Sequence, residues 1–296
     1  MIRLAHFSDI HVEARSHWTL GDWFGKRLTS WMNLRLLGRA RHFRQTERVL
    51  AALRTELRAR QFDRVIFSGD ATALGFEEES ARAAALLGIV DDGVPGLAVP
   101  GNHDYCTRRA EASGHFERHF SPWLVGERVD GHPYPFAQRV GPVWLIAVNS
   151  AVSHGWPTDA SGLVGVAQLQ RLEALLRRLD TGPRILVTHY PVRVADGSPE
   201  RPGHGLRDLE DVLAVARAGG ISLWLHGHRH TAYHHEASAE VPFPVICAGS
   251  ATEKPKWSYG DYTLAGDRVR AVIRGYDEKR ECFEEERSFE VQMRRN

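Results

Sequence analysis

Five short apolar segments of this chain each end next to a residue that can bind a metal ion, and this pattern constrains the fold most strongly. The segments and the residues that follow them are 3–8 with Asp9, 63–68 with Asp70, 96–99 with Asn102, 185–188 with His189, and 221–225 with His228. Short apolar runs bounded by Gly or polar residues are typical of buried β-strands. Because ligand sites of α/β sheets form at the carboxyl ends of strands, we expect these polar residues to share one edge.

Helical periodicity separates several of these strands. Amphipathic helices are predicted at residues 46–60, 77–90, 166–179 and 206–217, and a further buried strand at 143–148. The last part of the chain changes character, with short β-runs at 231–237, 243–248, 259–265 and 268–274. This order predicts mixed sheets flanked by helices. Because no linker rich in Pro, Gly or Ser divides the chain, we expect a single domain over residues 1–296.

Charge and cysteine content exclude several classes of protein. The 296 residues carry 38 basic and 37 acidic side chains, so no strong overall field attracts nucleic acid, and we expect no nucleic-acid partner. The three cysteines are scattered and lack a CxxC spacing, which argues against a disulfide framework and a structural zinc site. The chain shows no signal-peptide pattern and no apolar run of about 18 residues, so we expect a cytoplasmic protein.

The spacing of the polar residues suggests how they act together. His11 and His230 each follow two positions after another candidate ligand. In an extended chain, residues i and i+2 point the same way, so we expect Asp9 to pair with His11 and His228 with His230. The set contains carboxylates, an amide and imidazoles but no thiolate, which favours manganese, iron or zinc over copper and argues against a calcium cage.

Taken in order, these sequence blocks resemble the calcineurin-like metallophosphoesterase superfamily. The blocks are DxH at residues 9–11, GD at 69–70, GNHD at 101–104, His189, and GHxH at 227–230, and the segment 249–252 also fits. A lone DxH or GD is more often a turn or a cap, but the five blocks in order are specific. The resemblance implies a four-layer α/β/β/α sandwich of two mixed β-sheets, and a phosphoesterase with two divalent metal ions. We expect manganese, with iron or zinc as alternatives.

The resemblance also implies a role for each residue of the blocks. It assigns Asp9, His11 and His230 to the first metal, Asp70 to both metals, and Asn102, His189 and His228 to the second. Two such cations lower the pKa of a bridging water, and the resulting hydroxide would attack phosphorus in line. His103 would stabilise the transition state or protonate the leaving oxygen, with Asp104 orienting its ring. Outside the blocks, His204 is a candidate substrate contact, and His226 is expected to support a strand end.

Residues 15–44 form an insertion that bears on the substrate. They contain seven basic residues, the single acid Asp22 and the three tryptophans Trp18, Trp23 and Trp31. A helix over 26–40 would carry an apolar stripe, which suits a peripheral membrane contact, although a plain packed lid fits the pattern equally well. An early insertion of this kind resembles a bacterial branch that includes the chlamydial-type UDP-2,3-diacylglucosamine pyrophosphatase. We therefore expect residues 16–40 to form a helical lid over the metal site, with Trp23 and Trp31 lining an apolar channel.

Three hydrolase functions remain open on the sequence alone. They are a lipid-linked nucleotide pyrophosphatase acting on a substrate such as UDP-2,3-diacylglucosamine, a cyclic-nucleotide phosphodiesterase, and a general phosphodiesterase. A non-catalytic scaffold of the same fold is a remote alternative, because such relatives usually lose several ligands or the histidine of GNHD. Here His103 and all seven ligand positions are filled. The expected partner is therefore a phosphoester substrate, with a lipid link left open.

Overall fold

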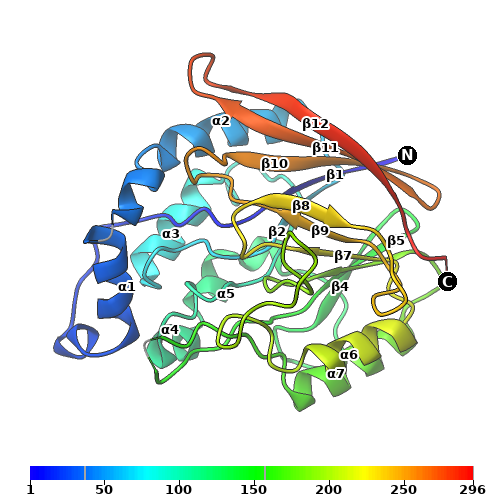
Figure 1. The fold of residues 1–296 in the computed structure, drawn as a ribbon, viewed down its shortest axis with the longest axis horizontal. Coiled ribbons are helices and arrows are strands. Elements are labelled where there is room, and N and C mark those ends of the chain that lie inside the picture. Colours follow the sequence, from blue (N-terminus) through cyan, green and yellow to red (C-terminus); the bar gives the residue numbers. More distant parts are fainter. Residues whose placement is uncertain (37, 157, 296) are drawn as a thin grey trace.

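The computed structural model describes residues 1–36, 38–156 and 158–295. Two six-stranded sheets face each other, and helices cover their outer surfaces (Figure 1). A large apolar cluster between the sheets contains Phe7 and Val65 from one sheet and Leu145 and Ile185 from the other. The four-layer α/β/β/α arrangement that the resemblance implies is therefore confirmed.

The first sheet combines three parallel strands with an antiparallel meander. Its order is β12-β11-β10-β1-β2-β3. The strands are β1 (Ile2–Phe7), β2 (Arg64–Phe67), β3 (Gly96–Ala98), β10 (Ser258–Ala265), β11 (Arg268–Asp277) and β12 (Cys282–Gln292). β1, β2 and β3 run parallel, so the residues that follow them emerge at the same edge.

The second sheet has a parallel centre and antiparallel edges. Its order is β4-β5-β6-β7-β9-β8. The strands are β4 (Phe136–Val140), β5 (Val143–Ala147), β6 (Arg184–Val187), β7 (Leu223–His226), β8 (Ala232–His235) and β9 (Val245–Ala248). β5 shows why these strands read as continuous apolar runs: Leu145 faces the other sheet, whereas Trp144 and Ile146 face the helices. Both faces of the strand are buried, as is usual in the parallel part of a sheet.

Helices pack on the outer face of each sheet. The α-helices are α1 (Lys26–Arg35), α2 (Thr46–Ala59), α3 (Glu77–Leu86), α4 (Arg108–Ser113), α5 (His115–His119), α6 (Val166–Arg178) and α7 (Leu209–Ala218). Short 3-10 helices are η1 (Leu20–Trp23), η2 (Arg39–Phe43) and η3 (Ser121–Trp123). Apolar residues of α2 and α3 belong to the same large cluster as the first sheet. Those of α6 and α7 pack on the second sheet. No helix among the described residues is long and apolar enough to span a bilayer.

Most predicted elements are confirmed, and the differences have physical reasons. The helix predicted over 26–40 ends at Arg35, and the chain then turns through Gly38 in the left-handed region, with φ 76°; residue 37 lies outside the described residues. No element was predicted from the sequence at β4, β12, α4 or α5. The sequence of β12, CFEEERSFEVQ, is rich in charged residues and mostly exposed, and pairing with β11 holds it as a strand.

Candidate metal centre

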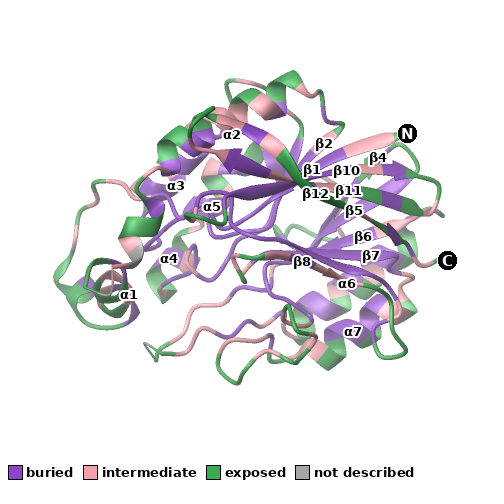
Figure 2. Ribbon diagram, turned by 45° about the horizontal axis from the view of Figure 1, so that its top comes forward, coloured by how far each residue is buried: buried purple, intermediate pink, exposed green. Residues whose placement is uncertain are grey.

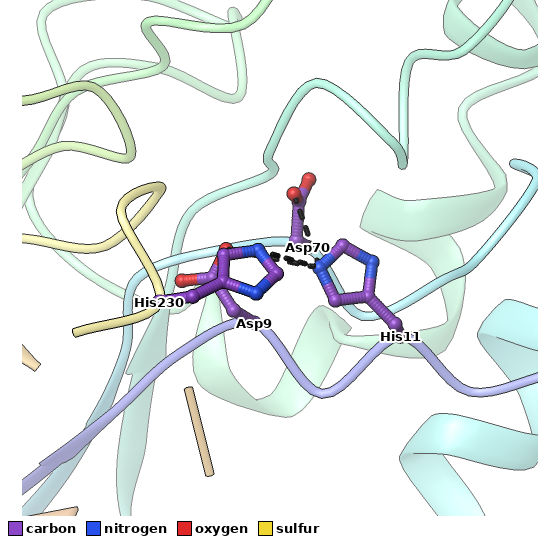
Figure 3. A group of neighbouring side chains, drawn as sticks. All are labelled: Asp9, His11, Asp70 and His230. Atoms are coloured by element: carbon purple, nitrogen blue, oxygen red, sulfur yellow. Dashed lines mark hydrogen bonds and ion pairs between the residues drawn. The ribbon is translucent and has the colours of Figure 1, made fainter. Parts of the chain in front are cut away.

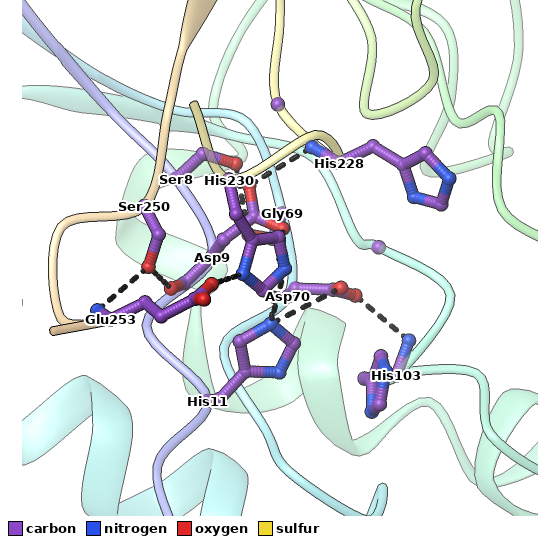
Figure 4. A network of polar contacts seen from close by, with 12 residues as sticks. Ser8, Asp9, His11, Gly69, Asp70, His103, His228, His230, Ser250 and Glu253 are labelled. Carbon is purple, nitrogen blue, oxygen red and sulfur yellow. Dashed lines mark hydrogen bonds and ion pairs between the residues drawn. The ribbon is translucent and has the colours of Figure 1, made fainter. Parts of the chain in front are cut away.

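The candidate ligands come from loops that follow five parallel strands. Asp9 and His11 follow β1, Asp70 follows β2, Asn102 follows β3, His189 follows β6, and His228 and His230 follow β7. The structure brings all seven side chains together at one edge of the two sheets, as the sequence predicts (Figure 4 shows several of them).

A first group consists of Asp9, His11, Asp70 and His230 (Figure 3). One ligand atom from each of these side chains lies within 4.8 Å of the others. The Nε2 atoms of His11 and His230 are 3.1 Å apart, and His230 Nε2 lies 3.2 Å from Asp9 Oδ1. The four side chains are buried or nearly so.

A second group consists of Asn102, His189 and His228, next to Asp70. Asn102 Oδ1 lies 3.2 Å from His189 Nε2 and 3.0 Å from His228 Nδ1, and the two nitrogens are 3.2 Å apart. The same oxygen of Asp70, Oδ2, lies 3.5 Å from His189 Nε2 and 3.7 Å from His11 Nε2. Asp70 therefore stands between the two groups.

The unpaired polar atoms of this centre fit divalent cations. Asp9 Oδ1 is buried and has no hydrogen-bond partner among the described residues. The Nδ1 of His189 lies 2.8 Å from the carbonyl oxygen of Ser68, which can only accept, so this nitrogen carries the proton. Its Nε2 lies 3.2 Å from Asn102 Oδ1 and 3.2 Å from His228 Nδ1, so a cation bound there would take the place of a proton on this nitrogen. A buried carboxylate oxygen without a donor, beside imidazole and amide groups, fits a cation site.

Burial and charge shift the pKa values of the ligands in both groups. Burial alone would raise the pKa of Asp70, but the neighbouring His189 and His103 hold it well below its usual range. Burial lowers the pKa of His189, but Asp70 and Asp9 together outweigh burial and raise the pKa to about 9, so a metal ion must displace a proton from this ring when it binds. Burial and His189 together lower the pKa of His228, so that ring is neutral, as a metal ligand must be.

The backbone at these residues is not extended, and the expected i, i+2 geometry is wrong. Asp9, His11 and Asp70 have φ of 55°, 41° and 59°, and His228 and His230 have φ of 71° and 55°. These values lie in the left-handed region, which is unfavourable for residues with a Cβ and is found where the surroundings over-determine the conformation. Tight turns, rather than a regular strand, therefore place each pair of ligands.

Asp104 holds the turn that carries Asp70. Its carboxylate accepts hydrogen bonds from the backbone amides of Asp70, Ala71, Thr72 and Gly101, at 2.8–3.2 Å. The Nδ1 of the neighbouring His103 lies 2.7 Å from the carbonyl oxygen of Ala73, and this contact helps to orient the ring. The role of Asp104 in orienting His103 stays a prediction.

Glu253 was not predicted from the sequence. Its carboxylate accepts a hydrogen bond from Nδ1 of His230 (Figure 4). It also lies 3.2 Å from the ammonium of Lys256. Burial raises the pKa of Glu253, but His230 and Lys256 together outweigh burial and lower the pKa to about 2. The carboxylate therefore fixes the tautomer that presents Nε2 to the first group. Its position directly after the recognised segment 249–252 was the available signal.

A cavity of about 550 Å³ opens at this centre. Its lining residues are Asp70, Asn102, His103, His228, His230 and Glu253 at the centre, Lys26, Thr29, Ser30 and Asn33 of α1, and Cys106, Thr158, Ala160, His204, Arg229 and Lys256. The insertion therefore contributes α1 to the wall of the cavity, and His204 lines the same cavity. That residues 16–40 form a lid over the site stays a prediction.

The predicted apolar channel is wrong. Trp23 and Trp31 do not line the cavity; their rings, 6.4 Å apart, gather with Trp18. Trp18 and Trp31 pack on a small cluster that includes Phe76, separate from the main core, and Trp23 is 47% exposed. On the apolar side of α1, Trp31 and Leu34 pack in this cluster and Met32 is exposed. The polar side of α1 faces the cavity.

We expect Glu253→Gln to weaken metal binding without unfolding the protein. Loss of the charged partner of a ligating histidine typically costs about tenfold or more in affinity. Titration calorimetry with Mn²⁺ measures the effect, and Glu278→Gln, at an exposed carboxylate that contacts Lys254, is the matched control. Equal Mn²⁺ affinity in both variants would contradict the role assigned to Glu253.

Comparisons with known proteins agree with this geometry. The model of the calcineurin-like phosphoesterase family matches residues 2–232. A curated relative, named a probable cyclic nucleotide phosphodiesterase of Synechococcus sp., is 30% identical over 186 residues, or 62% of this chain and 64% of the relative. The chain thus spans just under two thirds of that relative's length.

Solved structures show the same fold at low sequence identity. A dimetal phosphatase from Danio rerio superposes with a TM-score of 0.67 at 16% identity, over 99% of each chain. A purple acid phosphatase from yellow lupin seeds gives a TM-score of 0.62 at 12% identity, over 98% of this chain and 53% of the other. The family match covers more than three quarters of the chain, and the protein therefore belongs to the calcineurin-like phosphoesterase family.

Proposed function

We propose that this chain hydrolyses a phosphodiester or pyrophosphate bond with a pair of divalent cations, manganese first among them. The observation that carries the proposal is the position of Asp70 Oδ2, within 3.7 Å of a ring nitrogen in each of the two groups. A single carboxylate that serves two adjacent cations is the arrangement that two-metal catalysis needs. The oxygen and imidazole donors suit manganese, with iron or zinc as alternatives.

In this proposal each group holds one cation. The first ion is held by Asp9, His11, His230 and Asp70, and the second by Asp70, Asn102, His189 and His228. When bound, the two cations would polarise the phosphoryl oxygens and lower the pKa of a water molecule. The protein contributes the turns that fix the ligands. It also contributes the backbone amide of His103, which donates a hydrogen bond to Asp70 Oδ1 at 2.8 Å.

His103 is the proposed acid-base residue. Its Nδ1 donates to the carbonyl of Ala73, so Nε2 is the nitrogen that serves the substrate. The ring contacts His11 edge-to-face at 4.7 Å, and it lines the same cavity as Asp70 and Asn102. From this position the imidazole would stabilise the transition state or give a proton to the leaving oxygen.

The lining of the cavity favours a polar substrate. Hydroxyl, amide and charged groups of α1 face the cavity, and the tryptophans that were expected to hold acyl chains do not. A nucleotide-like phosphodiester fits this lining, and the name of the Synechococcus relative points to the same class. A lipid-linked substrate such as UDP-2,3-diacylglucosamine would have to keep its acyl chains outside the cavity.

We expect Asp70→Asn to lose at least one metal ion and to abolish turnover, because the amide neither bridges nor compensates two cations. Metal content per chain by mass spectrometry and hydrolysis of bis(p-nitrophenyl) phosphate with added Mn²⁺ test this. Asp180→Asn, at an exposed carboxylate that pairs with Arg139, is the control. Two bound metals and near-normal activity in Asp70→Asn would show that the bridging assignment is wrong.

His103→Ala should keep its metals but lose rate. The expected loss is roughly 10²–10⁴-fold in kcat, the range for an acid-base group, and it should shrink when the leaving group is p-nitrophenolate rather than an alkoxide. Comparing kcat for aryl and alkyl phosphodiesters measures this difference. An equal loss for both leaving groups would assign His103 to charge stabilisation instead of proton donation.

We also propose that the insertion contacts a membrane surface, with an anionic lipid bilayer as its partner. Large apolar side chains are exposed in one short stretch, namely Leu20, Trp23, Phe24, Met32 and Leu36, at the projecting end of the molecule that carries α1 (Figures 1 and 2). Arg15, Arg35, Arg41 and Arg44 of the same insertion are also exposed, and Arg35 pairs with Glu13. The single acid of residues 15–44, Asp22, is buried and paired with Arg27. Exposed apolar and basic side chains together match an anionic interface.

Vesicle binding tests this contact. The double variant Phe24→Ser/Leu36→Ser should lose most binding to vesicles of phosphatidylserine and phosphatidylcholine, since each apolar side chain contributes burial in the interface. Val90→Ser/Val166→Ser, at exposed apolar positions elsewhere, is the matched control. Co-sedimentation measures the bound fraction. If the wild-type protein does not sediment with anionic vesicles, the surface has another partner and the proposal fails.

A further inference from the structure

The helix α1 turns a polar face toward the candidate metal centre. Lys26, Thr29, Ser30 and Asn33 recur at the helical spacing i, i+3, i+4 and i+7, and all four line the cavity of about 550 Å³ that also contains Asp70 and Asn102. A surface helix normally buries its apolar side against the body of the protein. This wall of hydrogen-bonding groups therefore has a task other than packing.

Lys26 is the unusual member of this face. Its side chain is only 9% exposed, and its Nζ is buried without a hydrogen-bond partner in the part of the chain that the structure describes. The other two cations of the cavity are paired: Arg229 lies 2.9 Å from a carboxylate oxygen of Glu200, and Lys256 lies 3.2 Å from one of Glu253. An ammonium buried without a partner is costly and calls for an anion.

The rest of the insertion holds Lys26 in this place. The neighbouring Arg27 is buried, pairs with Asp22, and donates to the carbonyl oxygens of Leu74 and Gly75 at 3.0 and 2.8 Å. Those carbonyls follow Asp70 by only a few residues, so α1 is fixed to the same segment that carries the central carboxylate. The buried ammonium is therefore a built feature of the cavity wall.

Resting on the proposed function, we propose that Lys26, with Ser30 and Asn33, binds a second phosphate-class anion of the substrate, beyond the phosphoryl group at the metal centre. Lys26 forms no ion pair with a carboxylate among the described residues, and Asp70, which lines the same cavity, only partly offsets the lowering of its pKa by burial. The cavity is far larger than one phosphoryl group. Burial lowers the pKa of Lys26, and a bound anion would oppose that effect.

Diphosphate esters, such as nucleoside diphosphate derivatives, are then preferred as substrates to cyclic nucleotides, which carry one phosphate. ADP and AMP are suitable probes because they differ by one phosphate. Titration calorimetry with the Mn²⁺-loaded protein should show ADP binding about tenfold or more tightly than AMP, the effect of one charge-assisted contact. Lys26→Met should remove most of this preference, and Asn33→Leu should reduce it.

Two controls separate this inference from the proposed function. Lys279→Met removes an exposed lysine far from α1 in sequence and should leave both affinities unchanged. Lys26→Met should also raise the melting temperature of the anion-free protein by about 2 °C, because it removes a buried unpaired charge. Wild-type protein that hydrolyses bis(p-nitrophenyl) phosphate but shows no preference for ADP overturns the inference alone. A preference for ADP that survives Lys26→Met also overturns it. Absence of metal-dependent hydrolysis would instead refute the proposed function.

Discussion

The turn that carries Asp70 is the constraint on which the site depends. Gly69, with φ 103°, precedes it, and a Cβ on Gly69 would lie 2.7 Å from the ring of His189 and 2.8 Å from the amide of Gly101. A Cβ on Gly101 would lie 2.2 Å from the carboxylate of Asp70. Two loops from neighbouring strands can therefore approach this closely only where both carry glycine. The carboxylate of Asp104 holds the two loops together by accepting hydrogen bonds from a backbone amide of each.

This tight contact explains how one carboxylate reaches both groups of ligands. The amides of Ile10 and His11 donate to the carbonyl oxygen of Asp70, so the first loop is tied to the same turn. Ser250 and Thr252 add bonds to the carbonyl oxygens of Asp9 and Ile10 from the far end of the chain. These two loops are thus held largely by contacts to their backbone, while Asp9 Oδ1 and Asp70 Oδ2 accept no backbone hydrogen bond among those that the structure describes. The proposed ligand atoms remain directed at one another, where a cation is the natural partner.

Much of the fold and most of the site residues were predictable from the sequence. The strands of the parallel centres are apolar on both faces, and glycine and polar residues mark where they end, as at Gly69 and Gly101. The conformation of the ligands was not predictable, because left-handed backbone at Asp9 or His228 is imposed by tertiary contacts and not by local preference. Glu253 was missed for a similar reason. Its contact with His230 joins residues from two separate loops, so its position after residues 249–252 was the only indication in the sequence.

The insertion shows the same limit more sharply. Periodicity placed a helix there, and composition indicated an apolar and a basic side, but neither could say which side faces the site. The contact between the rings of Trp18 and Phe76 and the buried Arg27 decide which side faces the site, and both depend on residues that follow β2. Once the aromatic side is engaged there, Lys26 and Asn33 must face the cavity. A local rule is broken at this point, since a charge is buried and a polar helix face is turned inward. Such violations concentrate at functional sites because binding, and not folding, compensates for them.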